Sequence, residues 1–354
     1  MPALRPPESA TPPSPERPAP TLDRTSAGEL RSLTLSGLRG AIDRLPGPLR
    51  HLAAYKFGWR DEHGRPADGS PGKLVRPALT FLCARAAGGG TEAAMPAAVA
   101  VELVHNFSVL HDDVMDGDAM RRHRPTVWSA FGTARAVLLA DALLALAFQT
   151  VAAVGQESAT VLSDALLDMV QGQAKDLAME KDGTGTLADG LATAAGKTGA
   201  LLSCACRLGA LSAGAGEEQA ASYGEFGAHL GLAFQLADDI LGIWGDPTAT
   251  GKPVQSDLRS RKKSLPVLAA LTSGGAAAEP LALLYGRDPT PPFTTDDCAR
   301  LARLIEKAGG RAWAEERGRQ AYADAGAALE RARPEPGAAT DLLALADALT
   351  HRTH

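Results

Sequence analysis

Apolar residues at helical spacing run through this chain from Ser26 almost to its end. Alanine and leucine recur three and four residues apart, for example over residues 137–148, and this period is that of an α-helix. The alternating β-branched pattern of strands is scarce. Because glycine and proline interrupt helices, we expect breaks at residues 58–72, 88–90, 183–185, 214–216, 246–253 and 289–292. The segments between these breaks predict an all-α fold with helices long enough for a bundle.

Two aspartate-rich segments lie inside predicted helices, HDDVMD at residues 111–116 and QLADDIL at residues 235–241. Asp112 and Asp116 share one helical face, and two carboxylates on one face repel unless a cation neutralises them. One such motif alone is typical of a solvated acidic surface. Here an apolar stretch precedes the first motif at residues 99–110, and a basic cluster follows it at residues 121–124. Mg²⁺ prefers carboxylates, water and phosphate oxygens, so the pattern predicts metal ions that hold a diphosphate between two helices.

Further motifs accompany the two acidic segments in a fixed order. They are Gly72-Lys73-Leu74-Val75-Arg76-Pro77, the stretch His105 to Asp116, Arg121-Arg122, Gly172-Gln173-Ala174-Lys175-Asp176, Lys197-Thr198-Gly199, Phe234 to Asp239, Gly251-Lys252 and Lys262-Lys263-Ser264-Leu265-Pro266. With them the chain resembles the trans-polyprenyl (isoprenyl) diphosphate synthases, and among these the bacterial short-chain geranylgeranyl and farnesyl diphosphate synthases. The resemblance implies a homodimer in which residues 28–354 form a single-domain helical bundle of the isoprenoid synthase type with a central cavity.

The resemblance also implies a prenyltransferase reaction. An allylic diphosphate ionises, the double bond of isopentenyl diphosphate attacks the cation, and a proton is lost. Three Mg²⁺ ions and cationic side chains would stabilise the charge on the departing diphosphate. By the same resemblance Asp112 and Asp116 hold two of the ions and Asp238 holds the third, while Asp113 and Asp239 support them.

Two diphosphate sites follow from the resemblance. The allylic site would comprise Arg121, Lys197, Gln235, Lys252 and Lys262, with Thr198 beside the developing cation. The site for isopentenyl diphosphate would comprise Lys73, Arg76, His105 and Arg122. A histidine on an apolar helix, such as His105, is equally compatible with ordinary core packing.

The chain departs from the family pattern at three positions. Gly242 stands where a third aspartate is usual, and Pro71 and Gln255 stand where glycine is common. We expect activity to survive the first change, and Gln255 to narrow a loop beside the diphosphate.

Product length depends on the residues that close the cavity. Phe107 and Ser108 lie five and four residues before Asp112. A large ring followed by a small residue resembles short-chain synthases with a deeper cavity, and it favours a twenty-carbon geranylgeranyl product, with a fifteen-carbon farnesyl product as the alternative. Phe107 is also compatible with plain core packing.

Composition restricts the other classes. The formal charge is −5 and no long basic stripe occurs, which argues against nucleic acid as a partner. Four cysteines lack the spacing of a zinc site. We expect no membrane span and no signal peptide, hence a cytoplasmic protein. A class I terpene cyclase would not need the second diphosphate site, and a non-catalytic partner subunit would be expected to lose the first aspartates.

The N-terminus has its own composition. Eight of the first 20 residues are proline, which removes backbone donors and favours extended conformations, so we predict that residues 1–27 are disordered. The segment is either a dispensable tail or a docking peptide. It resembles the Pro/Ser-rich leaders that load some bacterial enzymes of this kind into encapsulin-like shells.

Overall fold

The computed structural model describes residues 24–69, 72–182, 185–246, 255–286 and 293–350. Of these residues 78% are helical and almost none are in strands, which confirms the all-α prediction. The first half of the chain forms α1 (Arg24–Ile42), α2 (Gly47–Lys56), α3 (Val75–Ala86), α4 (Thr91–Met115), the two-residue strands β1 (Met120–Arg121) and β2 (Arg124–Pro125), α5 (Val127–Phe131), α6 (Thr133–Val151) and α7 (Gln156–Asp182).

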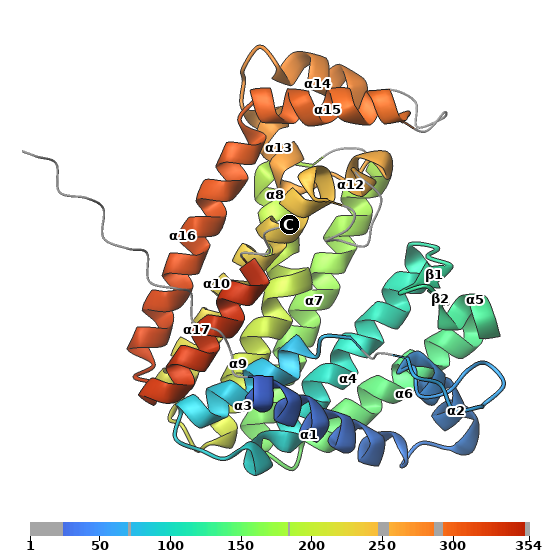
Figure 1. Cartoon of the computed structure of the whole chain (residues 1–354), viewed down its shortest axis with the longest axis vertical. Helices are drawn as coiled ribbons and strands as arrows, with labels where there is room; N and C mark the ends of the chain where they lie inside the picture. Colours follow the sequence, from blue (N-terminus) through green and yellow to red (C-terminus); the bar gives the residue numbers. More distant parts are fainter. Residues whose placement is uncertain (1–23, 70–71, 183–184, 247–254, 287–292, 351–354) are drawn as a thin grey trace, which may run out of the picture.

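The second half continues the bundle with shorter helices at one end. Its elements are α8 (Leu187–Ala194), the π-helix η1 (Ala195–Gly199), α9 (Ala200–Ser212), α10 (Glu217–Trp244), α12 (Ser256–Arg259), α13 (Leu265–Thr272), α14 (Ala278–Tyr285), α15 (Thr295–Lys307), α16 (Gly310–Arg331) and α17 (Pro336–Thr350). Figure 1 shows α7, α10 and α16 as long rods, with α14 and α15 lying across their upper end.

Helix α9 lies at the centre of the bundle, where it packs against α3, α4, α7 and α10. Its sequence, ALLSCACRLGALS, is almost wholly apolar, as expected of a helix that is surrounded by others. Helix α4 is similar over residues 97–104, which are all buried. From His105 onward α4 is only partly covered, so the first aspartate motif emerges from the core at the end of a helix that the core holds rigidly.

Two helices meet the length and composition of a membrane span, although we expected none. They are α4 and α6, and 67% of the apolar window of α4 is buried inside the bundle. The corresponding share for α6 is 39%, and Leu138 on this helix is 59% exposed. The apolar character of α4 therefore matches its place in the core, whereas α6 presents an apolar surface.

Several predicted boundaries can be compared with the structure. The breaks at residues 88–90 and 214–216 fall between helices, as does the described part of the break at residues 58–72, while those at residues 183–185, 246–253 and 289–292 fall partly or wholly outside the described residues. Helix α1 begins at Arg24, so residues 24–27, which we assigned to the disordered tail, are helical. Residues 1–23 lie outside the described residues, and their disorder stays a prediction.

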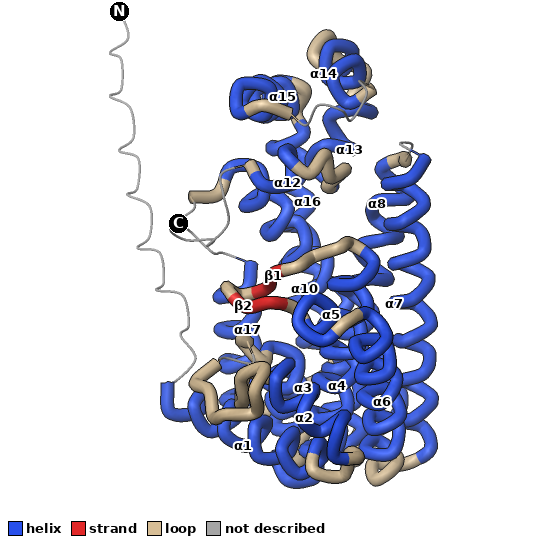
Figure 2. Tube along the Cα trace, turned by 90° about the vertical axis from the view of Figure 1, so that its right-hand side faces the viewer, coloured by secondary structure: helices blue, strands red, loops and turns tan. Residues whose placement is uncertain are grey.

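The pattern analysis missed the hairpin of β1 and β2, which Figure 2 shows in red. Met120 pairs with Pro125 and Arg121 pairs with Arg124, so Arg122 and His123 form a two-residue turn. Both turn residues have left-handed backbone conformations, with φ of 50° and 61°. Such turns normally contain asparagine and glycine, and the basic sequence gave no signal for one.

Candidate active site

The first aspartate motif occupies the last turn of α4. Asp112 lies in the helix and Asp116 is its C-cap residue, whose backbone N–H donates to the Asp112 carbonyl at 2.8 Å. Burial raises the pKa of Asp112 to about 6, and Asp116 adds to this rise through its like charge. Burial also raises the pKa of Asp116. Burial and mutual repulsion disfavour two ionised carboxylates side by side. A divalent cation bound between them would stabilise the ionised form of both, so the pair fits such an ion.

Lys197 provides a protein cation beside this pair. It lies in η1, where the helix widens to a π turn, a feature often found at functional sites. The close approach of η1 to α7 requires Gly172, because a Cβ there would lie 2.6 Å from the backbone nitrogen of Lys197. The Lys197 ammonium donates to Asp176 of α7 at 2.9 Å. Although burial opposes it, the charges of Asp112 and Asp176 raise the pKa of Lys197.

The second motif separates its two aspartates. Asp238 is exposed, whereas Asp239 is 2% exposed. Asp239 accepts hydrogen bonds from the backbone N–H of Leu265 at 2.9 Å and from the Gln235 amide at 2.9 Å. Gln235 in turn accepts from the Thr198 hydroxyl at 2.8 Å. Asp239 therefore anchors the start of α13 and orients Gln235, while Asp238 faces the solvent side of α10.

Lys262 lies beside the second aspartate motif and is linked through the Asp176 carboxylate to Lys197, beside the first. Its ammonium lies 3.4 Å from Asp239 and 3.7 Å from Asp257 of α12. Although burial opposes it, these two carboxylates raise the pKa of Lys262, and Asp176 adds to the effect. Asp176 thus interacts with Lys197 on one side and with Lys262 on the other, so the cations of the two motifs form one network across the bundle.

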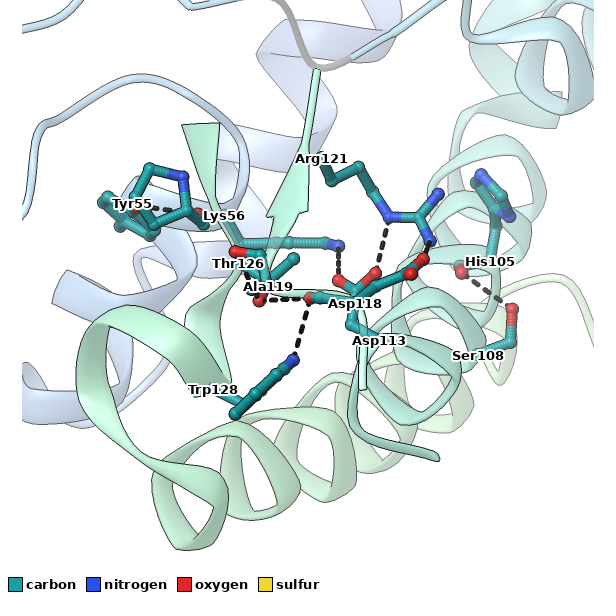
Figure 3. Close-up of polar contacts among 11 residues, drawn as sticks. Tyr55, Lys56, His105, Ser108, Asp113, Asp118, Ala119, Arg121, Thr126 and Trp128 are labelled. Atoms are coloured by element: carbon teal, nitrogen blue, oxygen red, sulfur yellow. Dashed lines mark hydrogen bonds and ion pairs between the residues drawn. The ribbon is translucent and has the colours of Figure 1, made fainter. Parts of the chain in front are cut away.

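The other aspartate of the first motif, Asp113, is held by two cations. It is 2% exposed, and Arg121 of β1 donates to it at 2.5 Å. Lys56, the last residue of α2, approaches its second oxygen at 3.6 Å. Figure 3 shows Arg121 and Lys56 reaching this carboxylate from different elements. We predicted Asp113 and Asp239 as metal ligands in a supporting role, and in the structure both carboxylates accept from protein donors.

A basic cavity of about 140 Å³ adjoins Asp113. The residues that line it include Lys56, His105, Arg121, Arg122 and Arg124. Burial lowers the pKa of His105 well below its usual value, and the neighbouring cations lower it further, so the imidazole is neutral at pH 7. Arg122 packs on Gly72, where a Cβ would lie 2.5 Å from Nη2, and the hairpin therefore meets the loop that carries Lys73.

Two of the predicted isopentenyl diphosphate residues lie outside the lining of this cavity. Lys73 is exposed and lines a neighbouring apolar pocket of about 200 Å³ together with Arg31. Arg76 lies beside Glu102, and burial raises the pKa of Glu102 to about 7 while Arg76 opposes the rise. Glu102 accepts a hydrogen bond from Asn106 at 2.9 Å. The structure thus places His105 and Arg122 together and sets Lys73 and Arg76 around them.

An apolar pocket of about 240 Å³ begins beside Asp112 and Lys197. Both predicted length-determining residues line it, Phe107 and Ser108, together with Met115, Met169, Val170, Gln173, Ala174 and Leu177. His111 lies there too and packs on Phe107, with ring centroids 4.5 Å apart. The pocket therefore runs from the charged motif along the facing sides of α4 and α7.

The arrangement suits a metal whose remaining ligands are water and phosphate. Among the described residues no group of three or more His, Cys, Asp or Glu side chains is close enough to form a metal site by itself. Mg²⁺ keeps several waters and binds through one or two carboxylates plus substrate phosphates, so sparse ligation of this kind fits it. Lys252 lies outside the described residues. Gln255 has a left-handed backbone conformation, with φ of 58°, which explains why glycine is common there.

Sequence motifs missed four participating residues. Lys56, Glu102, Asp176 and Asp257 contact the predicted residues from α2, α4, α7 and α12. Asp176 lies within one of the lysine-containing motifs and Asp257 lies between two of them, and a carboxylate beside these lysines was the available signal. Lys56 and Glu102 carry no such signal, because Lys56 reaches the site through the contact of α2 with the hairpin and Glu102 through the packing of α3 on α4.

Comparisons with known proteins place the chain among relatives of one kind. The sequence model of the family described as Polyprenyl synthetase matches residues 66–301. The chain is 45% identical over 308 residues to the (2E,6E)-farnesyl diphosphate synthase of Mycobacterium tuberculosis, an alignment that covers 84% of this chain and 86% of the relative. It is also 45% identical over 320 residues to the geranylgeranyl diphosphate synthase of the same organism, with 89% and 90% covered.

A solved structure is also similar to this chain in both sequence and fold. A crystal structure of polyprenyl synthetase from Streptomyces coelicolor A3(2) superposes with a TM-score of 0.88 at 46% identity. The match covers 92% of this chain and 98% of that one.

Proposed function

This chain belongs to the polyprenyl synthetase family, and on that premise we propose that it is a short-chain synthase that makes a twenty-carbon prenyl diphosphate. The family is Mg²⁺-dependent and condenses isopentenyl diphosphate with allylic diphosphates, so the chain is a transferase of prenyl groups. The product length, the three-ion site and the residue roles given below are our proposal.

The apolar pocket beside Asp112 and Lys197 carries the proposal. A diphosphate held at these two residues would direct its hydrocarbon tail into the pocket, toward Phe107 and Ser108. The pocket walls are apolar side chains of α4 and α7, which stabilise a growing prenyl tail by removing it from water. The fifteen-carbon product stays the alternative, because relatives of equal identity carry both names.

The proposed roles divide between binding and charge stabilisation. Arg121, Lys197 and Lys262 bind the allylic diphosphate as cations that are already in position before the bond to carbon breaks. Asp112, Asp116 and Asp238 would hold Mg²⁺, which when bound stabilises negative charge on the leaving diphosphate. Gln235, which is oriented by its hydrogen bond to Asp239, would contact the same diphosphate, and the Thr198 hydroxyl, which donates to Gln235, would lie beside the developing carbocation. His105 and Arg122 bind the second diphosphate in the basic cavity.

An apolar surface on α6 and α7 supports a homodimer. Val137, Leu138, Leu167 and Val170 are exposed there, and their exposed fractions range from 36% to 65%. Exposed apolar side chains on adjacent helices are typical of subunit interfaces, and a two-fold dimer would cover them. We further propose a cytoplasmic location and docking of the N-terminal tail to a partner or an encapsulin-like shell.

Product analysis tests the function directly. Purified protein is incubated with Mg²⁺, isopentenyl diphosphate and the five-, ten- or fifteen-carbon allylic diphosphate, and the products are separated by chain length. A dominant twenty-carbon product supports the proposal, whereas accumulation of the fifteen-carbon product selects the alternative. Release of cyclised hydrocarbon without use of isopentenyl diphosphate would identify a terpene cyclase, and absence of turnover would identify a non-catalytic subunit.

A further inference from the structure

Lys56 reaches the basic cavity from outside every motif of the family pattern. It is the last residue of α2, and its side chain is only 10% exposed. The neighbouring Tyr55 hydroxyl donates to the Pro125 carbonyl at 2.8 Å, which ties the end of α2 to the β1–β2 hairpin. The Lys56 ammonium lies at one oxygen of the Asp113 carboxylate and Arg121 contacts the other, as Figure 3 shows.

The charges around the cavity are unbalanced. Among the described residues that line it, Lys56, Arg121, Arg122 and Arg124 are cationic, and Asp113 is the one carboxylate. Asp113 already accepts from Arg121 at 2.5 Å, so the 3.6 Å contact of Lys56 is the weaker of its two ion pairs. A buried ammonium with a shared counter-ion is costly unless a further anion completes its coordination.

Neither of the other charged groups near the cavity changes this imbalance: Arg124 is held by protein acceptors, and Glu102 is only a partial anion. Arg124 is committed to the protein, since it donates to the Arg60 carbonyl at 3.0 Å and stacks over the Tyr55 ring. Glu102 lies on α4, three residues before His105, and its pKa of about 7 leaves it only partly ionised at neutral pH. An anion that accepts a hydrogen bond from the Lys56 ammonium would therefore have to lie in the cavity. The cavity is lined by donors of the kind that bind phosphate oxygens.

We propose that Lys56 is a binding residue for the diphosphate of isopentenyl diphosphate and completes the site formed by His105 and Arg122. This inference rests on the proposed function. Lys56 contributes a second cation beside Arg122, and it comes from α2, a helix that carries no other residue of the predicted site. Its contact with Asp113 positions the ammonium before the substrate arrives, so that little side-chain freedom is lost on binding.

Direct binding in the absence of metal tests the assignment. The dissociation constants of isopentenyl diphosphate and of inorganic diphosphate are measured by calorimetry in EDTA for the full chain. Lys56→Met removes the charge, Lys56→Gln removes the charge but keeps a donor toward Asp113, and Lys56→Arg keeps the charge. Lys307→Met, at an exposed position of α15, is the control.

We expect Lys56→Met and Lys56→Gln to raise the dissociation constant of isopentenyl diphosphate about tenfold or more, as loss of one charge-assisted contact does. Lys56→Arg and Lys307→Met should bind within about threefold of the wild type. With Mg²⁺ present, the KM for isopentenyl diphosphate should rise while the KM for the allylic substrate stays within about threefold.

Two results would overturn the assignment. If Lys56→Gln binds isopentenyl diphosphate as the wild type does, Lys56 serves only to hold Asp113. The same conclusion follows if the KM for the allylic substrate rises instead. Asp113 holds Arg121, which is proposed to bind the allylic diphosphate, so a loss of Asp113 positioning would weaken allylic binding. A wild-type protein that binds no isopentenyl diphosphate would contradict the proposed function as well, which separates the two failures. Melting temperatures of all variants identify any that do not fold, and Lys56→Gln, which keeps the donor to Asp113, then decides.

Discussion

The Asp257 carboxylate fills the space beside Gly242 that a side chain at position 242 would occupy. Asp257 is 9% exposed and comes from α12, whereas Gly242 lies on α10, one turn after Asp238. The position where the family pattern has a third aspartate on α10 therefore has a carboxylate in it, supplied by a different helix. We expected activity to survive the glycine, and this packing gives a physical reason for that expectation.

Restoring the family residue should accordingly harm the protein. Gly242→Asp forces a second carboxylate against Asp257, and overpacking of this kind costs about 1–3 kcal/mol, to which like-charge repulsion adds. We expect a lower melting temperature and lower kcat. The double variant Gly242→Asp with Asp257→Gly should recover both. A gain of activity in the single variant would show that the two carboxylates can coexist.

Asp112→Ala should lower kcat about a thousandfold or more, because it removes a proposed metal ligand that acts on the leaving diphosphate. The melting temperature should not fall, since a carboxylate whose pKa is raised to about 6 is not favourably ionised in the metal-free fold. Steady-state kinetics across a Mg²⁺ titration measure the effect, with Asp296→Ala on α15 as an exposed control. Near-normal turnover at ordinary Mg²⁺ concentration would exclude Asp112 as a ligand.

The two aspartates of the second motif should respond differently. Asp238→Ala changes an exposed residue, so kcat should fall while stability stays nearly unchanged. Asp239→Ala leaves Leu265 and Gln235 without their acceptor and should cost about 1–3 kcal/mol in the free energy of unfolding. Its effect on turnover should be the smaller of the two. Urea unfolding and kinetics on both variants check this, and the reverse order for kcat would assign the metal to Asp239.

Glu102 should give the stability of the protein a distinctive pH dependence. Its pKa is about 7 in the fold, above the usual 4.5, because burial favours the neutral acid. As pH rises from about 4.5 to 7, the unfolded carboxylate ionises while the folded one keeps its proton, so the free energy of unfolding falls by up to about 3 kcal/mol. Glu102→Gln should flatten this slope. Melting curves between pH 4 and 8 measure it, and parallel slopes in both proteins would contradict the assignment.

Product length should follow the residues at the deep end of the apolar pocket. Phe107→Ser opens space beside His111, so products should lengthen by at least one isoprene unit. Ser108→Phe places a ring closer to Asp112 and should shorten them. Turnover should fall only modestly in both, because neither residue binds diphosphate. Chromatography of the products decides, and unchanged distributions in both variants would place the closure of the pocket elsewhere, for example on a partner subunit.

The features that could be predicted from the sequence are those that depend on residues close together along the chain. Helical periodicity and the glycine and proline breaks located most of the helices. Asp112 and Asp116 lie four residues apart at the end of α4, as their spacing predicted, because periodicity determines which residues of one helix share a face.

Contacts between distant segments could not be predicted in the same way. Lys56 reaches Asp113 only because α2 packs beside the hairpin, and Asp257 reaches Gly242 only because α12 folds back on α10. The hairpin itself depends on left-handed backbone at Arg122 and His123, which basic residues seldom adopt without support from tertiary structure. Each of these features comes from the assembled bundle rather than from a local pattern.

The hairpin turn also links the two proposed diphosphate sites. Arg121, proposed for the allylic site, contacts Asp113, and Arg122, proposed for the isopentenyl site, packs on Gly72, yet the two residues are joined by one peptide bond. Consecutive Cα atoms are separated by about 3.8 Å whatever the surrounding helices do. Thermal breathing of the bundle therefore moves the backbone anchors of both arginines together, because a peptide bond is far stiffer than helix packing.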